Sequence, residues 1–306
     1  LLRACLARVL AILFRHATYI GADLCEDGIM PVLIDMCRDR DSSVKAAAMA
    51  ALGELLFYVT TEELPLSHAS SAAPVAATEE GQRGSALTPS SWLIPGSVFP
   101  LFSRVLRVQE ESVVRHYASK TLENIFLQGQ EAQVARFATK DIGQRLHQII
   151  DSSSPSSHSK AHPGAEERAT ALCALSRLLH HSAGRHLLSS IMGKHSGKMI
   201  LDGLSDTRSR ACSATVDLLN AVLVSSTAEH SEKTSLRHLR HALVGEQRTV
   251  SLLMRLLEHS RSLDLRGRIL LSLRLLIGQD LSVLKKACDK KLMIIMDRLK
   301  VQLDTT

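Results

Sequence analysis

Apolar residues recur along this chain with the spacing of an α-helix. Over residues 44–56 they stand at positions i, i+4, i+8 and i+11, which together form one face of a helix. Successive shifts of 70, 53 and 43 residues find the same pattern over residues 114–126, 168–178 and 211–221, and a last copy covers residues 265–276. We predict a long helix in each of these five stretches.

A shorter apolar segment precedes each long helix, so that each pair forms a helical hairpin. The five shorter segments are residues 30–37, 98–106, 142–150, 198–204 and 250–257. Once inserted loops are subtracted, the hairpins repeat with a period near the roughly 40 to 47 residues of armadillo and HEAT units. The pattern therefore predicts an all-α fold, an armadillo/HEAT-like right-handed helical-repeat superhelix, or α-solenoid.

Small residues recur at one position of the long helices. A larger side chain at this position would force neighbouring helices apart, so we expect the helices to approach one another closely there. The residues are Ala48, Ala118, Ala171 and Ala214.

Acidic residues stand shortly before a basic residue at the start of several long helices. Asp41 precedes Lys45, and Glu110 precedes Arg115. Carboxylates are favoured at the positive N-terminal end of a helix. We therefore expect each acid to stabilise the start of its own helix.

Two stretches interrupt the repeat, residues 65–96, rich in Ser, Ala, Pro and Thr, and residues 151–164, rich in Ser. Such composition buries too little apolar surface to offset the entropy of ordering, so we expect both to be flexible insertions. The rest of residues 1–306 is expected to form a single solenoid within a longer chain. Residues 1–19 would be the last helix of a preceding unit, and residues 281–303 would supply closing helices that act as a cap.

The cysteines and the apolar runs of the sequence indicate the compartment in which the protein is expected. The six cysteines contain no CxxC pair and lie far apart in sequence, which is unlike a disulfide framework and indicates a reducing, cytoplasmic compartment. All except Cys25 lie in apolar helical patterns, where we expect them to be core residues. No uninterrupted apolar run reaches the length of about 18 residues that a membrane span needs, so no membrane partner is expected.

No motif for catalysis or metal binding stands out. The sequence lacks a kinase catalytic loop, a nucleophile elbow and a zinc-protease motif, each of which has a fixed spacing. His158 and His162 stand four residues apart but have no Cys or carboxylate partner nearby. His180 and His181 end a helical pattern, where imidazolium would favour the negative end of the helix. We expect no catalytic residue, cofactor or metal.

Two sets of polar residues are candidates for binding. The first is a ladder at one position of successive long helices, which in armadillo proteins lines the concave groove. Polar residues at a solvent-facing position need no function, so ligand contact and plain exposure both stay open. The ladder residues are Glu54, Asn124, Arg177 and Asn220.

The second candidate is the basic last quarter of the chain. Residues 231–306 carry 15 Lys and Arg against 8 Asp and Glu, so this part could engage an acidic partner such as a tubulin tail. A solvated basic face is the alternative, and nucleic acid is disfavoured because no aromatic residues are interleaved for base stacking. The basic residues are Arg237, Arg240, Arg248, Arg255, Arg261, Arg266, Arg268, Arg274, Lys285, Lys286, Lys290 and Lys291.

Three segments together resemble one known family. They are residues 49–58 (MAALGELLFY), 91–95 (SWLIP) and 116–125 (HYASKTLENI), with Glu110 and Glu111 just before the last. The chain resembles the C-terminal armadillo/HEAT repeat region of the Runkel group, the fourth of the Unc-51-like serine/threonine kinases, often pseudokinases. This resemblance implies that Trp92 is an anchor that packs on the solenoid before the next hairpin.

The resemblance also implies a function. It implies a non-catalytic scaffold, preceded by a kinase or pseudokinase domain and associated with microtubules, cilia or flagella. Its partners would be other kinases, motor or microtubule-associated proteins, or tubulin. The alternative hypotheses are a generic adaptor for extended peptides, of the nuclear-transport or phosphatase-scaffold type, and the regulatory tail of an active kinase.

Overall fold

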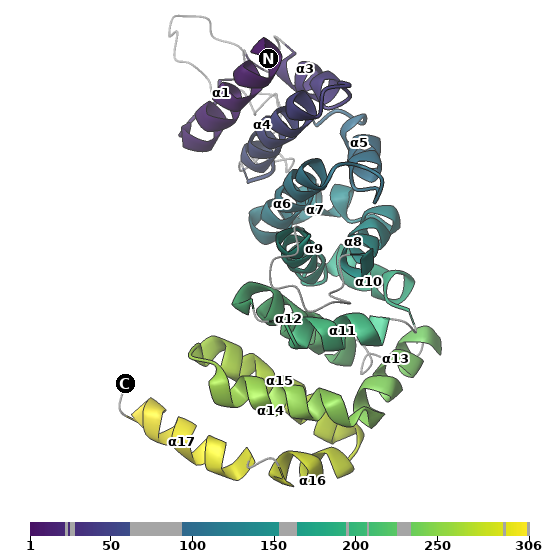
Figure 1. Ribbon diagram of the computed structural model, residues 1–306, viewed down its shortest axis with the longest axis vertical. Helices are drawn as coiled ribbons and strands as arrows, with labels where there is room; N and C mark the ends of the chain where they lie inside the picture. The colour runs from purple at the N-terminus through teal and green to yellow at the C-terminus, as the bar shows by residue number, and fades with distance from the viewer. Residues whose placement is uncertain are drawn as a thin grey trace, which may run out of the picture.

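The computed structural model is a curved stack of α-helices (Figure 1), and its described residues contain no strand. The all-α prediction is confirmed. The residues described are 1–21, 24, 28–61, 94–152, 164–193, 196–206, 208–224, 234–289 and 292–304.

Within the described residues, six helices form an inner row along one side of the stack. Each contacts the next in the row, from α1 to α15. Five of them correspond to the five predicted long helices, and α1 corresponds to the helix expected over residues 1–19. They are α1 (Leu2–His16), α4 (Ser42–Thr61), α6 (Ser112–Gln128), α9 (Ala165–Leu178), α12 (Ser209–Val224) and α15 (Leu263–Gln279).

Five shorter helices cover the other side of this row. Each packs on the inner helix that follows it in sequence. They confirm the five predicted shorter segments to within three residues at either end. They are α3 (Ile29–Met36), α5 (Val98–Val105), α8 (Lys140–Ser152), α11 (Ser196–Leu204) and α14 (Gln247–His259).

Three additional helices make the simple hairpin description wrong for part of the chain. They are α7 (Glu131–Phe137), α10 (Ser182–Ile191) and α13 (Thr234–Gly245). Each precedes the outer helix of its unit, so these units contain three helices. The sequence pattern missed α7 because its seven residues bury only Val134 and Phe137, too few to show a helical period.

The C-terminal helices are α16 (Ser282–Asp289) and α17 (Leu292–Asp304). Their existence was predicted, but their exposed apolar side chains differ from those expected of a cap. Leu281, Met293 and Ile294 are at least half exposed, whereas a terminal cap has a polar outer face.

The inner helices approach one another closely where the sequence predicted it. Ala48, Ala118 and Ala171 are fully buried, and Ala214 is 6% exposed. One such close approach lies between α4 and α6, where a Cβ atom added to Gly53 would stand 2.2 Å from Oγ1 of Thr121. Real carbon atoms do not approach an oxygen so closely, so only glycine fits at this crossing.

Ion pairs connect one unit to the next. Lys45 of α4 pairs with Glu110, Arg115 of α6 pairs with Glu167, and Arg168 lies 3.3 Å from Asp206. In each pair the basic residue belongs to one inner helix and the acid stands at or before the start of the next. The acids do more than stabilise their own helices, because each neutralises a charge of the preceding unit.

Arg168 is the most deeply buried member of these pairs. Its side chain is 1% exposed, and its Nε and Nη2 atoms have no hydrogen-bond partner among the described residues. Burial lowers the pKa of Arg168, while the Asp206 and Asp202 carboxylates oppose this effect. Burial also raises the pKa of Asp206, but hydrogen bonds from Arg208 outweigh it and leave the pKa below its ordinary value. Asp206 is therefore the counter-ion that stabilises this crossing.

The two expected insertions lie mostly outside the described residues. Residues 62–93, which include Trp92, and residues 153–163 are not described. At the edges, Ile94 is buried and Asp151 and Ser152 belong to α8. These edge residues are thus part of the packed solenoid rather than of the insertions.

Helix α4 is long and apolar enough to cross a membrane by length and composition alone. This differs from the expectation drawn from uninterrupted apolar runs. However, 61% of its apolar window is buried inside the protein, between α1 and α6. The hydropathy of α4 is therefore explained by its packing between α1 and α6.

The close crossing of α4 and α6 can be tested by adding one methyl group. Replacing Gly53 with Ala should lower the free energy of unfolding by about 1 to 3 kcal/mol, because the new Cβ collides with Thr121. The same change at Gly267 of α15, where no atom lies within 4 Å, should raise stability by up to about 1 kcal/mol. Thermal unfolding followed by circular dichroism compares the two. Equal effects would contradict the proposed crowding.

Removing the charge of Asp206 should destabilise the crossing of α9 and α12. In Asp206→Asn the buried guanidinium of Arg168 loses its counter-ion, which costs about 3 kcal/mol near neutral pH. Because the folded pKa of Asp206 is lowered, the wild type loses this advantage as pH falls below about 4. Urea unfolding and amide hydrogen exchange in α9 and α12 measure the difference.

The control for this experiment is Asp141→Asn. Asp141 pairs with Arg145 at 3.4 Å, and its side chain is 48% exposed. Its loss should change stability by no more than about 0.5 kcal/mol. A similar loss in both variants, or a gap between wild type and Asp206→Asn that does not narrow in acid, would argue against the buried pair.

Candidate protein-binding surface

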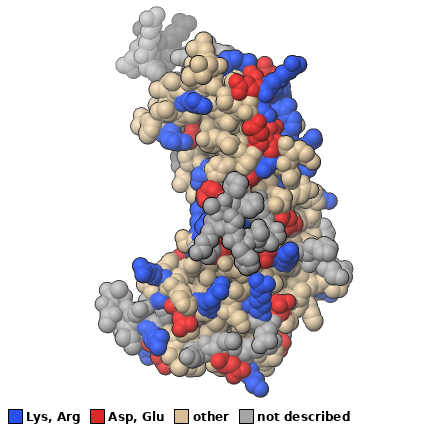
Figure 2. Space-filling model, viewed as in Figure 1, with Lys and Arg blue, Asp and Glu red and all other residues tan. Residues whose placement is uncertain are grey.

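The inner row of helices forms the concave side of the stack. Figure 1 shows α1, α4, α6, α9 and α12 following one another along this side, and Figure 2 shows that the molecule is hollowed there. The hollow arises because the outer helices cover only one side of the inner row. A long, continuous surface of this kind is what a stack of repeats offers to a partner.

A groove of about 500 Å³ lies on this surface between α1, α4 and α6. Its floor consists of small side chains, mainly Ala46, Ala47 and Ala50 of α4 and Ala11 of α1. The sequence contained a signal for this floor in the alanines on either side of Ala48, but only Ala48 was assigned a role, as a helix contact.

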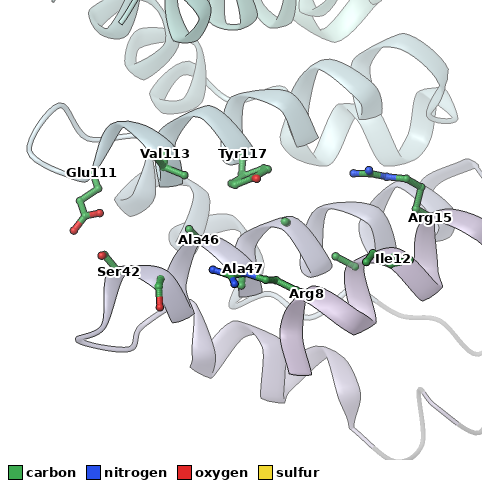
Figure 3. Close-up of a pocket in the computed structure, with 12 residues that line it drawn as sticks. Arg8, Ile12, Arg15, Ser42, Ala46, Ala47, Glu111, Val113 and Tyr117 are labelled. Atoms are coloured by element: carbon green, nitrogen blue, oxygen red, sulfur yellow. The ribbon is translucent and has the colours of Figure 1, made fainter. Parts of the chain in front are cut away.

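The walls of the groove carry larger apolar side chains. Ile12 of α1 and Val113 of α6 are more than half exposed, and Tyr117 of α6 is 36% exposed. In Figure 3, Ile12 and Tyr117 face the gap from opposite sides. Large apolar side chains left open to solvent around a concave floor are typical of an interaction site.

Charged and polar residues lie around the apolar part of the groove. Glu111 and Ser42 stand at one end and Arg15 at the other (Figure 3). Arg15 donates hydrogen bonds of 2.9 and 2.6 Å to Oε1 of Glu54. Arg8 of α1 is exposed and forms no ion pair with any described residue. The wall formed by α1 is therefore positively charged.

The structure separates the four ladder residues into two kinds. Glu54 is bound to Arg15, and Asn220 is 8% exposed and bridges two helices. Its Nδ2 donates to the carbonyl of Arg268 at 3.1 Å, and its Oδ1 accepts from Ser272 at 2.7 Å.

Asn124 and Arg177 remain available. Both are half-buried, and neither has a hydrogen bond or ion pair within the described part of the chain. The ladder is thus not a row of four equivalent free groups. Two of its side chains stabilise contacts between helices.

The basic residues of the last quarter also fall into different settings. Arg268 is paired with Asp217 at 2.6 Å and with Asp264 at 2.5 Å. It lines a depression of about 270 Å³ together with Asn220. Arg237 and Arg240 line a different depression, of about 380 Å³. The set is therefore distributed rather than gathered in one patch.

The remaining basic residues lie on α14, α15 and α16 or in adjoining turns. Arg266 is half-buried, and the exposed ones are Arg248, Arg255, Arg261, Arg274 and Lys285. In Figure 2 positive and negative side chains are intermixed over this part of the molecule. Lys290, Lys291 and the side chain of Lys286 lie outside the described residues.

The cysteines and histidines have structural surroundings. Burial raises the pKa of Cys37 to about 12 and those of Cys173 and Cys212 to about 11, so these thiols are poor nucleophiles. Cys5 and Cys288 are exposed, contrary to the core position expected for them. Within the described residues, no group of three or more His, Cys, Asp or Glu side chains could hold a metal ion.

His181 does not end a helix as the sequence suggested. It stands just before α10. Its Nε2 donates to the carbonyl of Phe126 at 2.6 Å, and its Nδ1 lies 2.7 Å from Oε2 of Glu131. This histidine therefore connects α10 to the preceding unit, a role that depends on contacts about 50 residues apart in sequence.

Comparison with known sequences finds relatives along nearly the whole chain. It is 28% identical to the serine/threonine-protein kinase RUNKEL of Arabidopsis thaliana over 99% of its length. It is 25% identical to the serine/threonine-protein kinase ULK4 of Mus musculus over 97% of its length. The chain spans 20% of the length of each relative. No protein-family profile matches it.

Comparison with solved structures identifies the fold. A designed armadillo repeat protein, YIII(Dq)4CqI, has a TM-score of 0.59 at 13% identity, over 89% of this chain and 92% of that one. Another, solved in complex with the peptide (KR)4, has a TM-score of 0.56 at 12% identity, with coverage of 88% and 91%.

A chain in the crystal structure of the SYS-1/POP-1 complex has a TM-score of 0.56 at 12% identity, over 93% of this chain and 46% of that one. At such low identity these likenesses concern the fold alone. The chain is therefore an armadillo-like helical solenoid, with sequence similarity over its length to part of two proteins named as serine/threonine kinases.

Proposed function

We propose that this chain is a non-catalytic protein-interaction segment of a longer, kinase-related scaffold of the Runkel type. The observation that carries the proposal is the 28% identity to kinase RUNKEL over 99% of the chain, combined with an armadillo-like fold. A stack of repeats with a long concave surface supports binding of proteins rather than chemistry on a small substrate.

The partners we propose are cytoskeletal, motor or kinase proteins, including tubulin. The resemblance to the Runkel group motivates this choice, together with a cytoplasmic location on microtubules, cilia or flagella. The exposed basic side chains of α14 and α16 support an acidic partner such as a tubulin tail. Arg268 does not belong to this surface, because Asp217 and Asp264 already neutralise it.

A second candidate is an adaptor that binds extended peptides along the concave surface. Its support is that Asn124 and Arg177, on neighbouring inner helices, have no hydrogen bond or ion pair with a described residue, since the main-chain groups of an extended peptide need hydrogen-bond partners. A designed armadillo protein with this fold was solved with the peptide (KR)4. Loss of peptide binding in Asn124→Ala, with no loss in Asn220→Ala, would favour this candidate.

The microtubule proposal predicts salt-sensitive pelleting of the chain with polymerised tubulin. The double variant Arg255→Glu and Lys285→Glu should pellet several-fold less than the wild type, because it reverses two exposed charges of the basic quarter. Binding should also weaken as ionic strength rises, since surface charges are screened. Sedimentation at a series of salt concentrations measures both effects.

The matched control is the double variant Lys140→Glu and Lys198→Glu. Both lysines are exposed and lie outside the basic quarter, so the change in net charge is the same. Equal pelleting of the two double variants would refute a specific basic surface. The wider scaffold proposal would be contradicted if affinity capture with the chain returned no cytoskeletal, motor or kinase protein.

A further inference from the structure

The groove between α1, α4 and α6 runs along the helices rather than across them. Its residues on α4 are Ser43, Ala46, Ala47 and Ala50, and its residues on α1 are Arg8, Ala11, Ile12 and Arg15. Both sets follow the i, i+3, i+4, i+7 spacing of a single helix face. The groove therefore extends for about 10 Å, or two helical turns, parallel to α4.

The polarity of the floor restricts what can lie in the groove. The four alanines of the floor carry no side-chain hydrogen-bonding atom, and Ile12 and Val113 add apolar walls. An extended peptide pressed against this floor would bury main-chain N–H and C=O groups without partners, which is costly. A helix has already satisfied its main-chain groups internally, so it can lie on alanine without this cost.

The polar residues that line the groove stand at its ends and on one wall: Ser42 and Ser43 are at the start of α4, Glu111 precedes α6, and Arg8 and Arg15 lie on α1. Glu54, the ladder residue of α4, is already bound by Arg15 through two hydrogen bonds. Asn124 of α6 is the free amide nearest to it in the ladder. A single amide side chain cannot form hydrogen bonds with all the successive main-chain groups of an extended strand.

The small floor suits a helix for a second reason. Alanine lets helices approach closely, as the buried contacts of Ala48 and Ala118 show in this chain. A partner helix could therefore place large apolar side chains against Ile12, Val113 and Tyr117 while its axis stays near α4. Such a helix would need one apolar stripe with three- and four-residue spacing.

The charge of the α1 wall determines which residues a partner helix would carry on the side that faces this wall. Arg8 is exposed and forms no ion pair with a described residue, and the side chain of Arg15 is 59% exposed despite its bond to Glu54. Both lie on the α1 wall (Figure 3). A carboxylate on that side of the partner would therefore meet a positive potential.

We propose that the groove between α1, α4 and α6 binds the apolar face of an amphipathic helix from another protein, with an acidic residue of that helix at Arg8. This inference rests on the proposed function only in assuming that the partner is a protein. It differs from the extended-peptide adaptor because the partner is helical and lies along one inner helix.

Selection of peptides from a displayed random library tests the proposal. The purified chain is the target, and the double variant Ala46→Gln and Ala50→Gln is used for counter-selection. Glutamine keeps a good helix propensity but fills the floor. Enriched peptides should carry apolar residues at i, i+3 or i+4, and i+7 with acidic residues on one flank, and should gain helical circular dichroism on binding.

Binding constants of the selected peptides for the wild type and the variants then show whether the peptides bind in the groove. The floor double variant should bind them about tenfold or more weakly, and Arg8→Glu should weaken them by an amount that shrinks at high salt. A matched control, Ala135→Gln with Ala242→Gln, changes two exposed helical alanines elsewhere and should bind as the wild type does. Proline placed inside the selected sequence should abolish binding, because it breaks the helix.

Three results would overturn the proposal. They are enrichment of peptides without the helical spacing, equal affinity of the floor variant and its control, and no peptide that distinguishes the floor variant from the wild type. The proposed function fails by different results, since it is tested by microtubule pelleting and by the identity of captured proteins. If partners are captured equally well by the floor variant, the scaffold proposal stands and the helix groove does not.

Discussion

The close side-by-side contact between successive inner helices is the constraint on which this structure depends. It requires small side chains at fixed places, such as Ala48 and Ala118, and glycine where Gly53 meets Thr121. It also requires that charges carried into the contact be neutralised. The ion pairs from each inner helix to the start of the next, such as Arg168 with Asp206, meet this need.

The concave surface follows from that contact. An inner helix contacts its neighbours in the row and an outer helix, so its remaining face is open to solvent. The sizes of the side chains on that face decide where the surface is hollowed. Alanine on α4, between larger residues on α1 and α6, produces a groove. Farther along, Asn220 and Arg268 are engaged with neighbouring helices, so that part of the surface has fewer free polar groups.

Because apolar and polar side chains lie on different parts of the surface, the two kinds of binding proposed for the chain fall on different helices. The N-terminal groove offers apolar floor and walls with a positive flank, which suits an apolar partner surface. The C-terminal helices offer exposed basic side chains intermixed with acids, which suits weaker, salt-dependent contacts. The two surfaces lie at opposite ends of the stack (Figure 1), so partners of the two proposed kinds would not compete for the same residues.

The sequence by itself determined the helices and the repeat. The spacing of apolar residues located the inner and outer helices, and alanine at one position predicted their close packing, because these signals are local to one helix. Helix α7 was not predicted, because its two buried residues, Val134 and Phe137, are too few to show a helical period. Only the tertiary structure decided which polar residues are free, because the partners of Asn220 and Arg268 lie about 50 residues away in neighbouring units.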